Sequence, residues 1–345
     1  MRKMLDHLSD VAAYQCAPDR KFISAEHDEI AQGMTTDIYF IKTLEILRHM
    51  GLAQTSVTAE IFARHSGIFA GLQEAAALLA ESDVEVWALP EGESFAPKEV
   101  LMRIHGPYEE FGLFETPLLG ILASSCGWAT AAHEIMQAAG DSKVTVFGAR
   151  HVHPAVAPVM EHAALIGGVN GASCVLGAKA AALEPVGTAP HALFLIAGDT
   201  VRGAVAYDEC MPESSARLIL IDTFKDEAEE SLRVAEAMQG HLAGVRLDTP
   251  SERGGVSAEL VREVRARLDM AGFPEVTIFV SGGLTPERLI ELKAAGAAAF
   301  GVGSYISGAK PIDMTMDLKE VAGKPIAKRG RIPGITKNDR LQRIK

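Results

Sequence analysis

The sequence has few cysteines, no long apolar run and no excess of positive charge. Its 4 cysteines include no CxxC pair of the kind that binds metals, so we expect reduced thiols in a cytoplasmic protein rather than a disulfide framework. No apolar run reaches the roughly 18 residues that a membrane-spanning helix needs. The basic N-terminus lacks a following apolar segment, so we also expect no secretory signal peptide.

Net charge sets a further limit on the partners of the chain. The formal charge is −12 at pH 7, and the isoelectric point is near 5.4. This charge argues against broad binding to nucleic acid or to acidic membranes, although an anionic substrate needs only a local positive pocket. With 345 residues, 48% of them hydrophobic, the chain can bury a large core in about two domains.

The N-terminal part, residues 1–122, is predicted to form an α+β open sandwich with a helical arm. A capped helix is expected from Gly33–Phe40 to about Met50, with Thr36 or Asp37 as its N-cap. Three strand-like segments are then interleaved with one helix, and a long apolar helical stretch, broken near Pro117 and Gly127, follows. These segments are Val57–Phe62, Val84–Leu89, Val100–Ile104, the helix Phe69–Glu81 and the long stretch Phe111–Ala139.

Residues 123–310 alternate between short apolar strands and amphipathic helices, which indicates a parallel α/β sheet. The expected strands are Val144–Phe147, Leu218–Asp222, Val245–Asp248, Val276–Ser281 and Ala298–Val302, with a further strand next to Gly187–His191. The expected helices are Ala155–Ile166, Ala172–Ala182, Asp226–Gln239, Ala258–Met270 and Pro286–Ala295. Because the strands are fewer than eight, an irregular, incomplete α/β barrel fits better than a regular one. Residues 311–345 are expected to be a basic C-terminal extension, either solvated or reaching anionic ligands.

Polar groups gather where the expected strands end, which is where parallel sheets bind ligands. The segment Gly244–Gly255 begins as a strand and then supplies Arg246 and Asp248, groups suited to phosphate and to sugar hydroxyls. Two late glycine turns, at 282–283 and at 301–303, suit a phosphate, because bare backbone N–H groups can approach it closely.

Several of these residues also have ordinary structural explanations. His191 could be a packed histidine, Phe147 a core residue and Asp222 the cap at a strand end. His151 and His153 would share one face of an extended segment, but no third ligand for a metal ion is visible.

The order of these motifs resembles the nicotinate phosphoribosyltransferase family, in its short archaeal-like form. The resemblance covers nearly the whole chain and is carried by the segments 36–39, 91–93, 106–108, 115–119, 147–150, 187–191, 222–224, 246–248, 281–283 and 300–303. It implies a homodimer that joins nicotinate to 5-phosphoribosyl pyrophosphate (PRPP), with ATP hydrolysis coupled to the reaction and Mg²⁺ bound with PRPP and ATP.

The resemblance also implies roles for single residues. His191 would accept phosphate from ATP, and Asp248 and Asp222 would be the other catalytic groups. Tyr39 from the partner subunit and Phe147 would enclose the pyridine ring. The remaining substrate contacts would be Asp37, Arg150, Thr188, Arg246, Ser281, Gly282, Gly283, Gly301 and Gly303. No protein metal site is implied.

Two departures from the family pattern leave alternatives open. Pro190 precedes the histidine where larger members have another residue, and Lys225 follows Phe224 in place of a second carboxylate. The alternatives are a decarboxylating quinolinate phosphoribosyltransferase, which must hold two carboxylates, and a catalytically silent protein that binds PRPP or a nucleotide.

Overall fold

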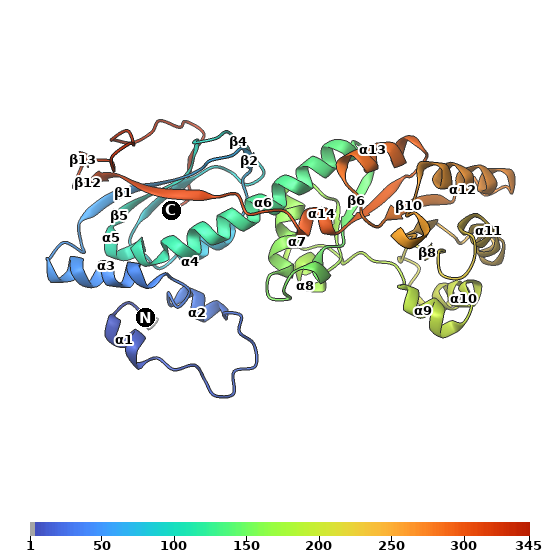
Figure 1. Cartoon of the computed structure of the whole chain (residues 1–345), viewed down its shortest axis with the longest axis horizontal. Helices are drawn as coiled ribbons and strands as arrows, with labels where there is room; N and C mark the ends of the chain where they lie inside the picture. Colours follow the sequence, from blue (N-terminus) through green and yellow to red (C-terminus); the bar gives the residue numbers. More distant parts are fainter. Residues whose placement is uncertain (1–3) are drawn as a thin grey trace. The chain divides into compact units, whose positions relative to one another are not determined.

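The structure, a computed structural model, describes residues 4–345, which form two compact units (Figure 1). One unit contains the residues up to Thr130 together with Lys310–Lys345, and the other contains Ala131–Ala309. The chain passes from the first unit to the second within α6 (Glu115–Ala139).

The first unit is built on a six-stranded antiparallel sheet with the order β13-β12-β1-β5-β3-β14. The strands are β1 (Ser56–Ala63), β3 (Glu85–Ala88), β5 (Val100–Pro107), β12 (Met314–Val321), β13 (Lys324–Pro325) and β14 (Gln342–Arg343). A separate pair joins β2 (Gly67–Ile68) to β4 (Ser94–Phe95).

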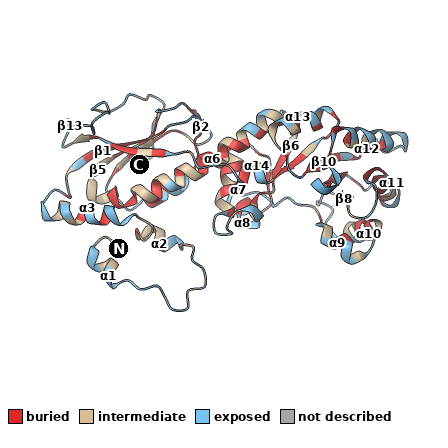
Figure 2. Ribbon diagram, in the orientation of Figure 1, coloured by how far each residue is buried: buried red, intermediate tan, exposed pale blue. Residues whose placement is uncertain are grey.

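Helices cover one face of this sheet, and the chain after β12 crosses the other (Figure 1). The helices of this unit are α1 (Leu8–Ala13), α2 (His27–Ala31), α3 (Ile38–His49), α4 (Leu72–Leu78), α5 (Tyr108–Phe111), a 3₁₀ turn at Gly112–Phe114 and the first part of α6. Figure 2 shows that the sheet strands are largely buried. Most of β1 is buried on both faces, because the C-terminal segment covers the side that the helices leave open.

The C-terminal residues are therefore placed differently from the expected separate extension. Residues 311–345 supply β12, which pairs with β1 along almost its whole length, and β14, which pairs with β3. The sequence of β12 hides this position, because Asp317, Lys319 and Glu320 give it the look of a solvated segment. The structure buries Asp317 and Lys319 instead.

The second unit is a six-stranded parallel sheet with the order β7-β6-β11-β10-β9-β8. Its strands are β6 (Lys143–Val146), β7 (Gly171–Ala172), β8 (Leu218–Leu220), β9 (Gly244–Leu247), β10 (Thr277–Ser281) and β11 (Ala299–Val302). Because β7 and β8 do not pair with each other, the sheet is a half-barrel. The predicted fold, an incomplete α/β barrel with an N-terminal sandwich, is confirmed.

The helices of the second unit connect these strands. They are α7 (Ala157–Ile166), α8 (Val175–Ala180), α9 (His191–Ala197), α10 (Thr200–Cys210), α11 (Glu227–Met238), α12 (Ala258–Met270), α13 (Pro286–Ala294) and α14 (Ser304–Ser307), with 3₁₀ turns at Ala149–His151 and Ser251–Arg253. The further strand expected next to Gly187–His191 is not formed, since residues before His191 are irregular and α9 begins there.

The expected breaks in the long apolar helix are also absent, because α6 is continuous over 25 residues. Pro117 is its third residue, where the backbone N–H would lack a helical partner in any case. Gly127 does not break the helix but allows close packing, since a Cβ there would lie 2.4 Å from the carbonyl oxygen of Lys310. Within residues 4–345, neither α6 nor any other helix has the length and apolar character needed to cross a membrane.

Candidate active site

The carboxyl ends of β6, β9, β10 and β11 surround a cavity of about 520 Å³ in the second unit. Parallel strands place their carboxyl ends at the same edge of a sheet, so residues distant in sequence meet there. The cavity is lined by Phe147, Ala149, Arg150, His151, Ser173, Gly187, Thr188, Arg246, Asp248, Ser281, Gly282, Gly283, Gly301, Gly303 and Ser304.

Arg246, on β9, is held by polar contacts from three neighbouring segments. Its Nε donates to Ser281 Oγ at 2.8 Å, and its two terminal nitrogens contact Thr188 Oγ1 at 2.8 Å and Asp248 Oδ2 at 3.2 Å. Ser281 Oγ in turn donates to Asp248 Oδ1 at 2.7 Å. Burial lowers the pKa of Arg246, while Asp248 and Asp222 raise it. An arginine remains charged under such conditions, so the network fixes one cation at the cavity wall.

Phe147 forms the aromatic part of the wall, directly after β6. The guanidinium carbon of Arg246 lies 5.2 Å from the centroid of its ring, and the Phe279 ring lies 6.0 Å away. Gly301, on β11, leaves room for this ring, because a Cβ at residue 301 would lie 2.4 Å from Phe147 Cε2. The missing side chain at Gly301 is therefore explained by packing of Phe147.

The turn between β10 and α13 offers bare backbone to the cavity. Gly282 and Gly283 have φ values of 91° and 59°, in the left-handed region that favours glycine. A Cβ at residue 282 would lie 3.1 Å from Asp248 Oδ1, whereas one at residue 283 would meet nothing within 4 Å. This turn precedes the N-terminus of α13, where Pro286 is one of the first residues, and helix N-termini attract anions.

His151 and Arg150 occupy the 3₁₀ turn that follows Phe147. Ser307 Oγ donates to the Gly303 carbonyl at 3.0 Å, so it accepts from His151 Nδ1 at 3.1 Å. This assignment leaves Nε2 of a neutral ring to accept from Arg150 Nε at 3.4 Å.

The suggested metal pair of His151 and His153 is not formed. His153 Nδ1 accepts from the Ala155 backbone at 3.2 Å, whereas His151 contacts Ser307. Residues 4–345 contain no group of three or more His, Cys, Asp or Glu side chains that could hold a metal ion.

His191 and Asp222 form a hydrogen-bonded pair that does not line the cavity. Nε2 of His191 lies 3.1 Å from Asp222 Oδ2, and the Asp222 side chain is almost fully buried. Burial raises the pKa of Asp222, while the contact with His191 lowers it. The other oxygen, Asp222 Oδ1, is buried and has no hydrogen-bond partner within residues 4–345. The nearby charge of Asp248 also raises the pKa of Asp222.

Tyr39 and Asp37 belong to the first unit, at the start of α3, and do not line this cavity. Asp37 occupies the N-cap position, but its carboxylate accepts from Thr116 Oγ1 at 3.0 Å rather than from the helix. The Tyr39 ring contacts Phe40 and is 55% exposed.

Sequence reasoning missed Ser173 and Ser304 as cavity residues. Ser173 follows β7, a strand of only two residues that no periodicity reveals. Its Oγ donates to Glu161 Oε1 at 2.8 Å, and Glu161 also accepts from the Cys174 backbone at 2.7 Å. Ser304 directly follows Gly303, so the late glycine turn was a usable signal for it.

Two domain models of one family together match most of the chain. The N-terminal domain model of quinolinate phosphoribosyl transferase matches residues 37–126, and its C-terminal domain model matches residues 128–317. A solved nicotinate-nucleotide pyrophosphorylase from Pyrococcus furiosus is 44% identical, with a TM-score of 0.88 over 92% of this chain and 82% of that one.

More distant relatives carry two kinds of name. A human nicotinate-nucleotide pyrophosphorylase [carboxylating] is 27% identical over 77% of this chain and 84% of its own length. A nicotinate phosphoribosyltransferase from Bacillus subtilis is 28% identical over 79% of this chain. The match spans only 62% of the Bacillus protein, which is less than two thirds of its length.

The family expected from the sequence is therefore wrong. Both domain models and the 44% identical structure point to quinolinate phosphoribosyl transfer rather than to ATP-coupled transfer to nicotinate. The expected nicotinate substrate, the ATP co-substrate and the phosphorylation of His191 by ATP all fall with that assignment. The motifs misled because they do not distinguish the two families by the acceptor ring.

Proposed function

Because the chain belongs to the quinolinate phosphoribosyl transferase family, we propose that it transfers the phosphoribosyl group of PRPP to quinolinate, with release of pyrophosphate and CO₂. The product is nicotinate mononucleotide. One observation carries this proposal: a single cavity joins an aromatic wall, two arginines, a carboxylate and bare glycine turns.

Quinolinate carries two carboxylates on a flat ring, and the cavity offers matching groups. Arg150 and Arg246 line it with His151 beside them, and Arg246 already lies over the Phe147 ring. Arginine binds carboxylates with two parallel hydrogen bonds, and an aromatic face stacks on a pyridine. Arg246 adds a basic group beside Phe147 although it comes from a distant strand.

The phosphoribosyl group has its own contacts in the proposal. The 5′-phosphate would lie at the turn of Gly282 and Gly283, against the N-terminus of α13. Gly303 would line the same phosphate-binding part of the cavity. Thr188 and Ser281 would supply hydroxyl groups for hydrogen bonds to the phosphoribosyl group. The Asp248 carboxylate, held by Arg246, would accept hydrogen bonds from the ribose hydroxyls.

The chemistry follows from these positions. The ring nitrogen of quinolinate forms a bond to C1 of the ribose as the C1–oxygen bond to pyrophosphate breaks. Positive charge on the ring nitrogen then stabilises the electron pair left on the adjacent carbon when its carboxylate leaves as CO₂, and a proton takes its place. Arg150 and Arg246 would stabilise negative charge on the leaving pyrophosphate without rearrangement.

Mg²⁺ fits this site as a companion of PRPP. Magnesium is commonly held by one or two carboxylates together with substrate phosphates. Asp248, which lines the cavity, would be one such ligand, and Asp222, whose buried Oδ1 has no partner among the described residues, would be the other. When bound, the ion neutralises phosphate charge. His191 would keep the Asp222 carboxylate oriented through its contact with Oδ2.

We also propose a homodimer in which Tyr39 of the partner subunit covers the acceptor ring opposite Phe147. The support is that Tyr39 and its neighbour Ile38 are both exposed on α3. Asp37, which precedes Ile38, would keep the start of α3 in place because its carboxylate accepts a hydrogen bond from Thr116 Oγ1. Mixing Tyr39→Ala and Phe147→Ala protomers should restore part of the activity, since one site of each hybrid would be intact. Absence of recovery despite proven exchange of subunits would remove the shared site.

The function is tested by incubating the purified chain with PRPP, Mg²⁺ and either quinolinate, nicotinate or nicotinamide, each with and without ATP. We expect nicotinate mononucleotide from quinolinate, with no dependence on ATP. Product from nicotinate and none from quinolinate would overturn the proposal. Binding of PRPP without turnover of any acceptor would instead favour the non-catalytic alternative.

A further inference from the structure

A second cavity lies in the first unit, between the sheet and the C-terminal segment that follows β12. It has a volume of about 220 Å³ and shares no lining residue with the active-site cavity. Its lining consists of Glu60, Phe62, Lys98, Val100, Asp317, Lys319, Gly330, Arg331, Ile332 and Thr336.

Lys319 enters this cavity from a β-bulge in β12. Thr58 pairs with Glu320 and Ala59 pairs with Leu318, so Lys319 is the extra residue between them. Bulges commonly redirect a side chain at functional positions. Asp317 and Lys319 are both buried, on the part of β12 that the C-terminal segment covers.

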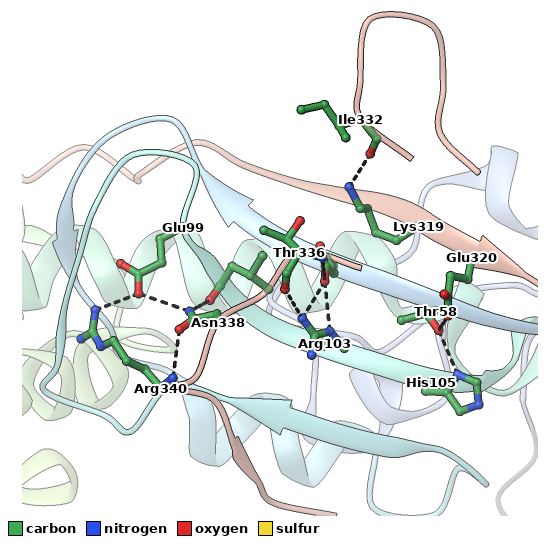
Figure 3. Close-up of polar contacts among 12 residues, drawn as sticks. Thr58, Glu99, Arg103, His105, Lys319, Glu320, Ile332, Thr336, Asn338 and Arg340 are labelled. Carbon is green, nitrogen blue, oxygen red and sulfur yellow. Dashed lines mark hydrogen bonds and ion pairs between the residues drawn. The ribbon is translucent and has the colours of Figure 1, made fainter. Parts of the chain in front are cut away.

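Lys319 is a buried cation without an ion-pair partner among the described residues. The residue is 8% exposed, and its Nζ donates to the carbonyl of Ile332 at 2.6 Å (Figure 3). No carboxylate in residues 4–345 forms an ion pair with it. An ammonium group has three donors, and burial of an uncompensated charge is costly. Lys319 is therefore suited to an anion that supplies further acceptors.

The acidic groups of the lining already have partners. Glu60 accepts from Arg103 at 2.8 Å and from the Thr336 backbone at 3.0 Å. Asp317 accepts from Lys328 at 2.8 Å and from Arg331 at 3.0 Å. Neither carboxylate forms an ion pair with Lys319.

Two further cations complete the lining. Lys98 is exposed, has no ion pair with any carboxylate of residues 4–345, and sits in a turn with a left-handed φ of 66°. Arg331 lies 5.0 Å from the centroid of the Phe62 ring, which orients its guanidinium. The cavity therefore has two unmatched positive charges and a third that is shared with Asp317.

We propose that this cavity binds a small phosphate-class anion between Lys319, Lys98 and Arg331. The volume of about 220 Å³ is large enough for inorganic phosphate or pyrophosphate. The bound anion joins β12, the turn at Lys98 and the C-terminal segment, and so stabilises the cover of this sheet face. The proposal does not depend on the reaction assigned to the other cavity.

The first experiment measures how phosphate protects Lys98 from acetylation, with peptide mass spectrometry as a site-resolved readout. Lys42, an exposed residue on α3, is the internal control, and sodium chloride at equal ionic strength is the control for screening. At a free anion concentration ten times the dissociation constant, acetylation of Lys98 should slow about tenfold, and the acetylation rate of Lys42 should not change. Separate titrations with inorganic phosphate and pyrophosphate identify which anion binds more tightly.

Lys319→Met tests the buried cation, and Lys337→Met is its matched control. Lys337 lies in the same C-terminal segment but is exposed and paired with Asp339. The first variant should weaken protection of Lys98 about tenfold or more, because charge-assisted bonds to the anion are lost, and the second should not. Protection that is absent in the wild type, or equal in all these proteins, would overturn the proposal.

Lys98→Asn keeps the test decisive if Lys319→Met does not fold. Asparagine tolerates the left-handed backbone at residue 98 and removes the charge. Equilibrium dialysis with labelled phosphate should show one fewer bound anion per chain in this variant. An unchanged stoichiometry would contradict the site.

Discussion

The guanidinium carbon of Arg246 lies 5.2 Å from the centroid of the Phe147 ring. Arg246 lies on β9, and Phe147 directly follows β6. The contact therefore joins two strands that are not neighbours in the sheet. It places a fixed cation at the aromatic surface proposed to hold a pyridine dicarboxylate. A mobile lysine would not reach Thr188, Ser281 and Asp248 at the same time, as the planar group of Arg246 does.

Arg246→Lys should therefore lower kcat/KM by about a hundredfold, although the charge is kept. The reason is the loss of the planar group that contacts Thr188, Ser281 and Asp248 together. Steady-state kinetics with varied quinolinate and PRPP measure the effect. Arg202→Lys is the matched control, because Arg202 is exposed on α10 and donates only to a backbone carbonyl. Equal activity of both variants would exclude a site role for Arg246.

Gly301→Ala should displace the Phe147 ring, since the new Cβ would lie 2.4 Å from it. We expect a loss of about 1–3 kcal/mol in the free energy of unfolding, together with reduced activity. Chemical denaturation measures the stability. Gly120→Ala, in α6 and with nothing within 4 Å of its Cβ, should be neutral or stabilising. Phe147→Leu combined with Gly301→Ala should recover stability but not activity, and failure to recover stability would disprove the proposed clash.

Glu115 gives a pH dependence of stability. Burial raises its pKa to about 7 from 4.5, with Lys328 lowering it and Asp317 raising it. Between pH 4.5 and about 7, Glu115 is protonated in the folded chain but ionised in the unfolded chain. The contribution of Glu115 to the free energy of unfolding therefore falls as pH rises through this range. After allowance for solvent screening the loss is on the order of 1 kcal/mol.

Glu115→Gln should remove this loss, so the variant gains stability relative to the wild type as pH is raised from 5 to 8. Thermal unfolding across this pH range measures the difference. Glu209→Gln, at an exposed position of α10, should follow the wild type at every pH. Parallel curves for wild type and Glu115→Gln would show that Glu115 does not titrate in this range.

Asp222 gives a pH dependence of activity. Burial raises the pKa of Asp222 in the metal-free chain, so the carboxylate proposed to hold Mg²⁺ becomes protonated at a higher pH than an ordinary aspartate. Activity should therefore fall on the acid side of the profile and recover as pH rises. Asp222→Asn should lower kcat about a hundredfold and weaken the dependence on Mg²⁺. Asp269→Asn, on the exposed face of α12, is the control, and an unaltered magnesium response in Asp222→Asn would remove that residue from metal binding.

Much of the second unit could be predicted because its local and tertiary preferences agree. The helix α12 was predicted with its observed ends, since Ser257 caps it and its buried face repeats regularly at Val261, Val264 and Leu268. The carboxyl ends of the strands carried the polar residues that line the cavity. Parallel topology is what brings such residues together.

Other features depended on long-range contacts that the sequence does not show. Strand β12 is charged but buried, because Arg331 and Lys328 of a later segment neutralise Asp317. Strand β7 has only two residues, so Ser173 was missed. The acceptor was misassigned because the matched motifs do not distinguish one acceptor ring from another, and the second arginine near Phe147 comes from β9.

The most direct test follows the carboxylate that leaves. Quinolinate labelled with ¹⁴C in the carboxylate next to the ring nitrogen is incubated with the purified chain, PRPP and Mg²⁺, without ATP. We predict release of labelled CO₂ in equal amount to the nicotinate mononucleotide formed, and none when PRPP is omitted or Arg246 is replaced by alanine. No labelled CO₂ from the wild type, alongside mononucleotide formation from nicotinate, would contradict the account.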